Sequence, residues 1–321
     1  MIVTSCPLRI SLVGGSTDHP EFLNRYGYGS VISFPSNLRT YVTIHKDVFG
    51  ANSIDQNFIL NYSRREVVKH LYEIKNELIR ICFQDLDVKQ INCSLTSDIY
   101  SAGSGLAASS AYLQALVKSI YVMRNEFISE FEVCKIAESI ERKFNPLVGQ
   151  QDFFGSMGGF KLLKFYKNSD PEIRYLSTRI FLEMEMYLLY TGILRNSTQI
   201  LQSIDHEKSK QLLDDVKDLE QAIEQNNLLD FNAIINRAWY KKKQTSSEIC
   251  ANDKLQELDL QLSRDQQVLS HKLCGAGNGG YFLIFTKSGS CLDTRYNMIK
   301  RVTVSETGLK WINLQHEFTK L

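Results

Sequence analysis

The chain has 321 residues, which is enough for two domains or for one large domain with a full hydrophobic core. Its 37 Lys and Arg residues nearly balance its 36 Asp and Glu residues, so neither a nucleic acid nor an anionic membrane is expected as a partner. The seven cysteines show no C-x-x-C spacing, and no signal peptide or membrane-spanning run is apparent, which predicts a soluble cytoplasmic protein.

The N-terminal segment predicts a strand that ends in a polar turn. Apolar residues alternate through residues 1–13, with Arg9 inside the alternation, and Gly14-Gly-Ser-Thr-Asp18 follows directly. A strand that ends in such a turn is a common way to deliver polar side chains to the edge of a site. The ordinary alternative for Asp18 is an N-cap of a helix at residues 20–26.

Strands and one helix are expected before the central loop of the chain. Alternating apolar residues predict one or two strands in residues 31–46 and a short strand at 57–62. Apolar residues at helical spacing predict a helix over residues 67–83, with its charges on a solvated face. Residues 91–97 form another extended run.

A loop of small residues follows and opens into a helix. Gly103 and Gly105 allow the backbone to approach a ligand closely, and small side chains follow up to Ala111. Unpaired backbone N–H groups and the positive end of a helix dipole are what a phosphate needs. The residues expected to hold the triphosphate of ATP are Ser101, Ala102, Gly103, Ser104, Gly105, Leu106, Ala107, Ala108, Ser109 and Ser110.

Two other interpretations of this loop remain open at this point. A start of small residues can simply be a tight packing site. The loop lacks the Gly-Lys-Ser/Thr ending of a Walker loop, but Gly103–Ala108 fits the G-x-G-x-x-A pattern of dinucleotide-binding folds. Residues 98–102 separate the strand from the first glycine and no second strand ending in an acid follows, which argues against a dinucleotide site.

Acidic residues gather after the loop. A helix predicted at residues 130–144 places Glu138 and Glu141 on one face, and Asp152 follows in a turn between glycines. In isolation, the glutamates are expected to pair with Lys135 and Arg142 or to face solvent. Asp152 alone would be a turn or capping residue.

The second half restarts after a polar segment. Residues 160–166 predict a strand, and residues 168–172, which include a proline, are the expected domain boundary. Lys241–Lys243 is expected on a solvated helix face. The further elements are a strand near 186–190, helices at about 206–225, 228–247 and 252–264, a glycine-rich loop at 275–280, a strand at 281–285, a helix-like run at 291–299 and two strands within 302–314.

Three stretches in this order resemble the motifs of the galactokinase, homoserine, mevalonate and phosphomevalonate (GHMP) kinase superfamily. They are Pro7–Asp18, Gly103–Ala111 and Gly275–Gly280. The resemblance implies an α+β two-domain fold that covers essentially the whole chain. Residues 1–167 would form an N-terminal ribosomal-S5-like α/β domain for nucleotide and catalysis, and residues 168–321 a C-terminal ferredoxin-like α+β domain.

Within this superfamily, the chain looks most like the D-glycero-D-manno-heptose 7-phosphate kinases. Pro7–Ser11, Tyr190–Ser197 and Trp239–Lys243 carry this likeness. It implies that the protein uses ATP and Mg²⁺ to phosphorylate the anomeric hydroxyl of D-glycero-D-manno-heptose 7-phosphate. The product would be the 1,7-bisphosphate, in the biosynthesis of heptose for surface polysaccharides. The partners would be a sugar phosphate and ATP, with no nucleic acid or membrane, and the question of a homodimer stays open.

The resemblance also implies a role for each matching residue. Glu141 precedes Asp152 by eleven residues, the spacing that the family uses between its metal ligand and its catalytic acid. Ser109 and Glu141 would hold magnesium, Asp152 would accept or orient the proton of the sugar hydroxyl, and Arg9 would keep Asp152 ionised. The expected substrate-binding residues are Gly15, Thr17, Asp18, Gly275, Gly277 and Arg195, with Arg195 and the lysine run as cationic partners for a substrate phosphate.

The chain departs from the family pattern in two motifs. Gly105-Leu-Ala-Ala-Ser-Ser110 replaces the usual Gly-Leu-Gly-Ser-Ser-Ser, and Asn278 stands where glycine is common. Ala108 therefore has no hydroxyl for phosphate, whereas Asn278 tolerates a positive φ angle. A non-catalytic sugar or nucleotide sensor on the same fold is the competing hypothesis, followed by a kinase for galactose, fucose or mannose and, more distantly, by a Rossmann-type oxidoreductase.

Overall fold

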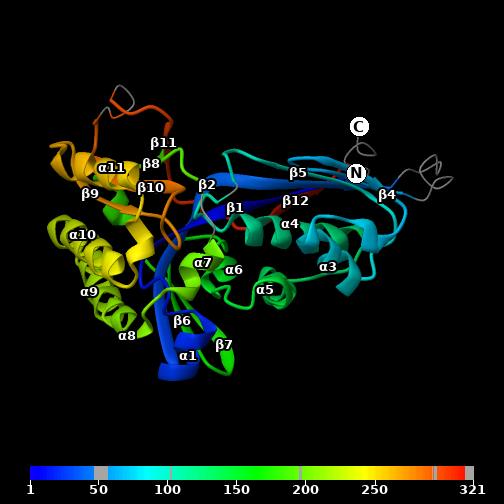
Figure 1. The fold of residues 1–321 in the computed structure, drawn as a ribbon, viewed down its shortest axis with the longest axis horizontal. Helices are drawn as coiled ribbons and strands as arrows, with labels where there is room; N and C mark the ends of the chain where they lie inside the picture. Colours follow the sequence, from blue (N-terminus) through cyan, green and yellow to red (C-terminus); the bar gives the residue numbers. More distant parts are fainter. Residues whose placement is uncertain (47–56, 102, 195–196, 291, 293–294, 315–321) are drawn as a thin grey trace.

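A computed structural model describes residues 1–46, 57–101, 103–194, 197–290, 292 and 295–314. Two sheets form its framework (Figure 1). The large sheet has eight strands: β1 (Ile2–Val13), β2 (Tyr28–His45), β3 (Phe58–Asn61), β4 (Arg65–Val68), β5 (Asn92–Ser97), β6 (Lys161–Tyr166), β7 (Ser169–Tyr175) and β12 (Lys310–Asn313). The small sheet has four: β8 (Met184–Tyr190), β9 (Val268–Leu273), β10 (Tyr281–Lys287) and β11 (Ile299–Val302).

The long strand β2 organises the large sheet, whose strand order is β12-β1-β2-β5-β3-β4. Beyond its pairing with β1, β2 pairs with β6 through residues 28–33 and with β5 through residues 40–45. The small sheet runs β11-β8-β10-β9 and is antiparallel throughout. The mixed α+β class expected from the sequence is therefore confirmed.

The helices fall into two groups along the chain, one before the first strand of the small sheet and one after it. The first group is α1 (Pro20–Tyr26), α3 (Glu77–Asp85), α4 (Ala108–Met123), α5 (Glu130–Phe144) and α6 (Gln151–Phe154). The second group is α7 (Ser197–Gln202), α8 (His206–Ser209), α9 (Leu212–Glu224), α10 (Leu228–Gln244) and α11 (Asp253–Arg264). Short 3₁₀ helices lie at Leu71–Glu73, Arg179–Leu182 and Ser247–Cys250. In Figure 1, α3, α4 and α5 lie beneath the large sheet, and α9, α10 and α11 surround the small one.

The change from one sheet to the other comes later in the chain than the polar segment suggests. β7 pairs antiparallel with β6, so residues 168–172 lie in a hairpin of the large sheet. β12, near the C-terminus, also returns to this sheet beside β1. The division at residues 167 and 168 stays a prediction, and the small sheet begins with β8.

Residues 67–83 do not form the single helix that their spacing predicts. Residues 65–68 pair with β3 as strand β4, and a helical turn at 71–73 follows. The Glu66 carboxylate accepts hydrogen bonds from the backbone N–H groups of Lys75 and Asn76, and the Asn76 side chain caps α3. These polar contacts delay the helix until Glu77. The run at 291–299 lies partly outside the described residues, and those described before β11 are not helical.

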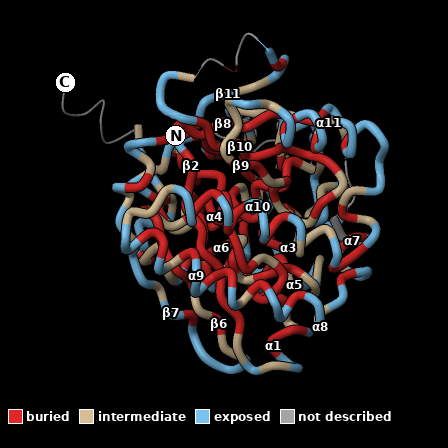
Figure 2. Tube along the Cα trace, turned by 90° about the vertical axis from the view of Figure 1, so that its left-hand side faces the viewer, coloured by how far each residue is buried: buried red, intermediate tan, exposed pale blue. Residues whose placement is uncertain are grey.

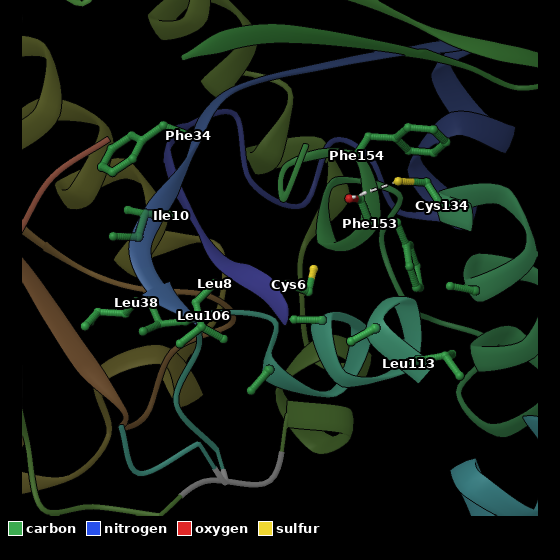
Figure 3. Packing of buried hydrophobic residues seen from close by; sticks show 14 of the residues in the cluster. Cys6, Leu8, Ile10, Phe34, Leu38, Leu106, Leu113, Cys134, Phe153 and Phe154 are labelled. Atoms are coloured by element: carbon green, nitrogen blue, oxygen red, sulfur yellow. Dashed lines mark hydrogen bonds between the residues drawn. The ribbon is translucent and has the colours of Figure 1, made fainter. Parts of the chain in front are cut away.

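The main core lies between the large sheet and the helices α4, α5 and α6. Leu8 and Ile10 of β1 and Phe34 of β2 are fully buried in it, as are Phe153 and Phe154 of α6 (Figure 3). Buried residues of α4 and α6 and of β10 in the small sheet belong to one core cluster, and Figure 2 shows buried residues gathered in the middle of the molecule. Because two phenylalanines anchor so short a helix, α6 has a defined position in the molecule. None of the helices in the described ranges has the length and apolar character of a membrane span.

Candidate active site

A cavity of about 340 Å³ lies where the three glycine-containing motifs meet. The first motif contributes residues of β1 and the turn after it, the second contributes the loop before α4, and the third contributes Gly275 and Ala276. Helices α5, α6 and α10 add side chains. The residues of the expected phosphate loop that line it are Ser101, Gly103, Ser104, Gly105, Ala107, Ala108, Ser109 and Ser110. Leu106 is instead fully buried in the core, and Ala102 lies outside the described residues.

The N-terminus of α4 faces this cavity without a side-chain cap. Its N-cap residue is Ala107, in the left-handed region at a φ of 57°, and it makes no side-chain capping bond to the backbone of the helix. The first N–H groups of an α-helix have no partner within the helix. This end of α4 is therefore suited to an anion, as the small-residue loop predicts.

The other two motifs are in direct contact with this loop. Arg9 donates a hydrogen bond from Nη1 to the carbonyl oxygen of Gly105 at 2.8 Å. A Cβ atom at Gly280 would overlap with the carbonyl groups of Ser104 and Gly103, so only glycine allows the third motif to pack this closely. The three motifs are thus parts of one structure.

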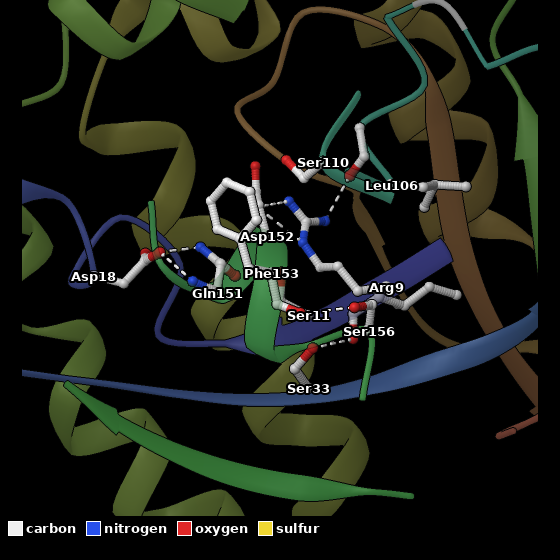
Figure 4. A network of polar contacts seen from close by, with 12 residues as sticks. Arg9, Ser11, Asp18, Ser33, Leu106, Ser110, Gln151, Asp152, Phe153 and Ser156 are labelled. Atoms are coloured by element: carbon white, nitrogen blue, oxygen red, sulfur yellow. Dashed lines mark hydrogen bonds and ion pairs between the residues drawn. The ribbon is translucent and has the colours of Figure 1, made fainter. Parts of the chain in front are cut away.

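Asp152 and Arg9 form the charged centre of the cavity (Figure 4). Nε and Nη2 of Arg9 donate to Oδ1 of Asp152 at 3.1 and 2.5 Å. The Arg9 side chain is 5% exposed, whereas the Asp152 side chain is 24% exposed and faces the cavity. Asp152 therefore has a fixed partner and an accessible carboxylate, which is what a general base requires.

Glu141 lies beside the phosphate loop and is buried. Oγ of Ser110 donates to Oε2 of Glu141 at 2.7 Å. Burial raises the pKa of Glu141 to about 7, and the charge of Asp152 acts in the same direction, while hydrogen bonds from Ser110 and Ser109 lower it. Among the described residues, no Lys or Arg forms a salt bridge with Glu141.

Glu138, three residues earlier, behaves differently. It forms a salt bridge with Arg142 at 2.8 Å and accepts a hydrogen bond from Gln150, which confirms the ordinary pairing expected for one of the two glutamates. Glu141 keeps only hydroxyl partners and faces the cavity. A carboxylate with neighbouring hydroxyls is a donor set that suits magnesium, which needs one or two carboxylates and completes its shell with phosphate oxygens and water. No group of three His, Cys, Asp or Glu side chains that could enclose a metal occurs in the described ranges.

Asp18 lies behind Gln151 in the wall of the cavity. It is fully buried and is not among the lining residues, because Gln151 covers it: the backbone N–H and Nε2 of Gln151 donate to its carboxylate at 3.0 and 2.8 Å. Burial raises its pKa. Its role in binding the sugar stays a prediction, whereas the alternative of an N-cap is wrong, since His19 is the N-cap of α1.

The other expected substrate-binding residues divide into two groups. Gly15 and Gly275 line the cavity. Thr17 donates to the carbonyl oxygens of Gly14 and Ser30, which makes it part of the turn after β1. Gly277 packs against Ile249 and is not among the lining residues, and Arg195 lies outside the described ranges.

Two cavity residues, Lys272 and His19, have no signal in the sequence that could single them out. Nζ of Lys272 donates to the carbonyl oxygens of Ser11 and Leu12 at 2.6 and 2.8 Å, and burial lowers its pKa to about 8. His19 is buried, and burial together with the charge of Lys242 lowers its pKa to about 3, so its ring is neutral. Lys242, from the lysine run that the sequence marks as a cationic partner, also lines the cavity and hydrogen-bonds Oγ of Ser16.

The two other lysines of the run serve the structure. Lys241 pairs with the fully buried Asp215 at 2.9 Å, and Lys243 pairs with Asp259 at 2.6 Å. Neither lines the cavity, so Lys242 alone brings the charge of this run to the site.

Comparison with known proteins shows the family of this chain. A D-glycero-alpha-D-manno-heptose 7-phosphate kinase from Campylobacter jejuni subsp. jejuni is 30% identical over 325 residues, which cover 93% of this chain and 92% of that protein. The L-fucokinase/L-fucose-1-P guanylyltransferase of Bacteroides fragilis is 25% identical, and the match covers 88% of this chain and 34% of that longer protein. No protein-family model matches the chain.

A solved structure has the same fold along its whole length. The crystal structure of a D-glycero-D-manno-heptose 1-phosphate kinase from Bacteriodes thetaiotaomicron superposes with a TM-score of 0.76 at 19% identity, and covers 98% of this chain and 99% of the other. With the phosphate loop, Arg9 and Asp152 in one cavity, the chain belongs to the GHMP kinase superfamily and is a sugar kinase of that type.

Proposed function

We propose that the protein transfers the γ-phosphoryl group of ATP to the anomeric hydroxyl of D-glycero-D-manno-heptose 7-phosphate and forms the 1,7-bisphosphate. The observation that carries the chemistry is the Arg9–Asp152 pair in the same cavity as the uncapped N-terminus of α4. A sensor would need the binding loop but not a buried guanidinium that orients an accessible carboxylate. The pair therefore favours catalysis over sensing.

The mechanism follows from what these side chains can bind and accept. The backbone N–H groups of residues 103–109 hold the triphosphate at the N-terminus of α4. Asp152 accepts the proton of the attacking hydroxyl, and Arg9 orients its carboxylate and adds positive charge near the transferred phosphoryl group. Glu141 and the hydroxyl of Ser109 would hold magnesium, which when bound supplies charge neutralisation for the phosphates.

The identity of the sugar is supported by the relative from Campylobacter jejuni and by positive charge in the cavity. A substrate phosphate needs cationic or N–H donors. Lys242 of α10 lines the cavity, and Arg195 remains a second expected donor. A kinase for an unphosphorylated sugar such as fucose is the alternative, because the Bacteroides fragilis protein contains a fucokinase.

A coupled assay for ADP release, with ATP, magnesium and a panel of sugars, tests the proposal. The panel contains heptose 7-phosphate, unphosphorylated heptose, mannose, fucose and galactose. We expect the highest kcat/KM for the heptose phosphate, with the new phosphate on the anomeric oxygen. Preference for an unphosphorylated sugar would overturn the substrate, and binding of ATP without turnover of any sugar would favour the sensor.

A further inference from the structure

Gln151 lines the cavity and carries a side-chain acceptor that no group in the described part of the chain uses. The residue is 6% exposed and lines the cavity directly before Asp152 in α6. Its Oε1 atom is buried and, among the described residues, has no hydrogen-bond partner. Several buried side-chain atoms in the described residues lack a hydrogen-bond partner, and among them only Gln151 Oε1 belongs to a residue that lines this cavity. A buried acceptor without a partner costs free energy, so it calls for an explanation such as a ligand.

Asp18 determines which way the Gln151 amide points. The backbone N–H of Gln151 donates to Oδ2 of Asp18, and Nε2 donates to Oδ1. A carboxylate can only accept, so the amide must turn its N–H₂ group toward Asp18 and its oxygen away. Figure 4 shows Asp18 and the Gln151 amide facing each other. A Cβ atom at Gly149 would overlap with the Asp18 carboxylate, so this glycine makes room for the arrangement. The buried Asp18 therefore positions the Gln151 amide.

We infer that Oε1 of Gln151 accepts a hydrogen bond from the sugar hydroxyl next to the one that Asp152 deprotonates. Gln151 and Asp152 are consecutive residues of α6 that both line the cavity, and a sugar offers neighbouring hydroxyls to two such acceptors. The identity of the sugar rests on the proposed function. For a reaction at the anomeric hydroxyl, the neighbouring group is the 2-hydroxyl.

This contact makes Gln151 a specificity-determining residue. A site with a buried acceptor rejects an analogue that lacks the matching hydroxyl, because the acceptor stays unpaired in the complex. We expect the parent enzyme to favour heptose 7-phosphate over its 2-deoxy analogue by about 10- to 100-fold in kcat/KM. The hydrogen bond holds the sugar in place relative to Asp152. Its loss should therefore lower kcat/KM for the sugar and leave the KM for ATP unchanged.

The experiment compares the two substrates with the parent enzyme and with Gln151→Met, which keeps the length of the side chain and removes its acceptor. We expect the variant to turn over the 2-deoxy analogue and the full substrate with kcat/KM values within about 3-fold of each other. A variant that keeps the discrimination of the parent would overturn the inference, as would a parent that does not discriminate. Thermal unfolding of both proteins confirms that the comparison is between folded enzymes.

One further variant separates the contact from its surroundings. Gln150→Met makes the same chemical change one residue earlier, at a side chain that does not line the cavity, and should keep the discrimination of the parent. Loss of discrimination in Gln150→Met as well as in Gln151→Met would contradict the inference.

A failure of the inference about Gln151 can be distinguished from a failure of the proposed function. If the parent phosphorylates a sugar other than heptose 7-phosphate, the proposed substrate is wrong. The comparison is then made with the analogue of the accepted sugar that lacks the hydroxyl next to the reacting one. The role of Gln151 is decided by that comparison whichever sugar is used.

Discussion

Both hydrogen bonds from Arg9 to Asp152 go to one oxygen, Oδ1. Among the described residues, none donates a hydrogen bond to Oδ2, and the Asp152 side chain lies at the cavity (Figure 4). The pair is therefore asymmetric: one oxygen is held by the guanidinium, and the other is available to a sugar hydroxyl. This division lets Arg9 orient the base without occupying the atom that takes the proton.

Asp152→Asn should retain ATP binding and lose about a hundred- to ten-thousand-fold in kcat, because an amide cannot accept the proton. The measurements are ADP release for turnover and titration calorimetry for ATP. Arg9 keeps its bond to Gly105 in the variant, so the loop should hold its shape. Turnover within a few-fold of the parent would remove Asp152 from the mechanism.

Glu141→Gln should raise the magnesium concentration needed for half-maximal activity more than it alters the KM for the sugar. The amide is neutral, and a carboxylate ligand supplies charge that magnesium needs. Glu138→Gln is the matched control, since Glu138 pairs with Arg142 on the same helix and does not line the cavity. An equal magnesium dependence in both variants would count against Glu141 as a ligand.

Ala107→Gly should stabilise the protein by about 1 kcal/mol, because Ala107 adopts a φ of 57°, where alanine is strained and glycine is not. Ala108→Gly is the control: it is the first residue of α4, where glycine should instead destabilise, by up to about 1 kcal/mol. Urea unfolding measures both changes. Two shifts of the same sign would contradict strain at Ala107.

The meeting of the phosphate loop, Glu141, Arg9 and Asp152 at one cavity could be predicted because each part carries its own local signal. The small-residue loop, the helix at 130–144 and the strand with Arg9 are each marked by spacing or composition, and the family motifs fix their order. The helix α5 has the bounds that its periodicity predicts, Glu130–Phe144. Its Ser129–Glu132 capping box gives this helix a clear start.

What could not be predicted depends on contacts between distant residues. Asp18 and Gln151 are 133 positions apart, and nothing near Asp18 in the chain shows that an amide will cover it. The lysine run looks uniform, but Asp215 and Asp259 take two of its members and leave Lys242 at the cavity. The single helix predicted over residues 67–83 was wrong because of nearer contacts, since the Glu66 carboxylate holds the backbone N–H groups of Lys75 and Asn76 just before α3.

Acid should destabilise the second half through Asp259, which accepts hydrogen bonds from Trp239, Lys243 and His271. Although burial raises its pKa, these bonds lower it from the ordinary 3.8 to about 2. Because the folded pKa is the lower one, the stabilisation is complete above about pH 4 and is lost as the pH falls through about 2.

The expected loss is roughly 2 kcal/mol in the free energy of unfolding, and Asp259→Asn should show a shallower decline over the same window. Urea unfolding at several pH values between about 2 and 4 measures this loss. Asp253→Asn, at an exposed position of the same helix, should follow the parent. An Asp259→Asn variant as acid-sensitive as the parent would show that other groups cause the decline.

Lys242→Met should raise the KM for the phosphorylated sugar about 30-fold and leave the KM for ATP nearly unchanged, which is the effect of losing one charged hydrogen bond of about 2 kcal/mol. Lys217→Met, at an exposed position on α9, is the control for loss of charge alone. The ratio of kcat/KM for heptose 7-phosphate to that for unphosphorylated heptose is the decisive quantity, because it cancels general damage to the site. The ratio should fall in Lys242→Met and stay at the parent value in Lys217→Met. If it falls in Arg195→Ala instead, the substrate phosphate is held by Arg195 and Lys242 serves only the turn at Ser16.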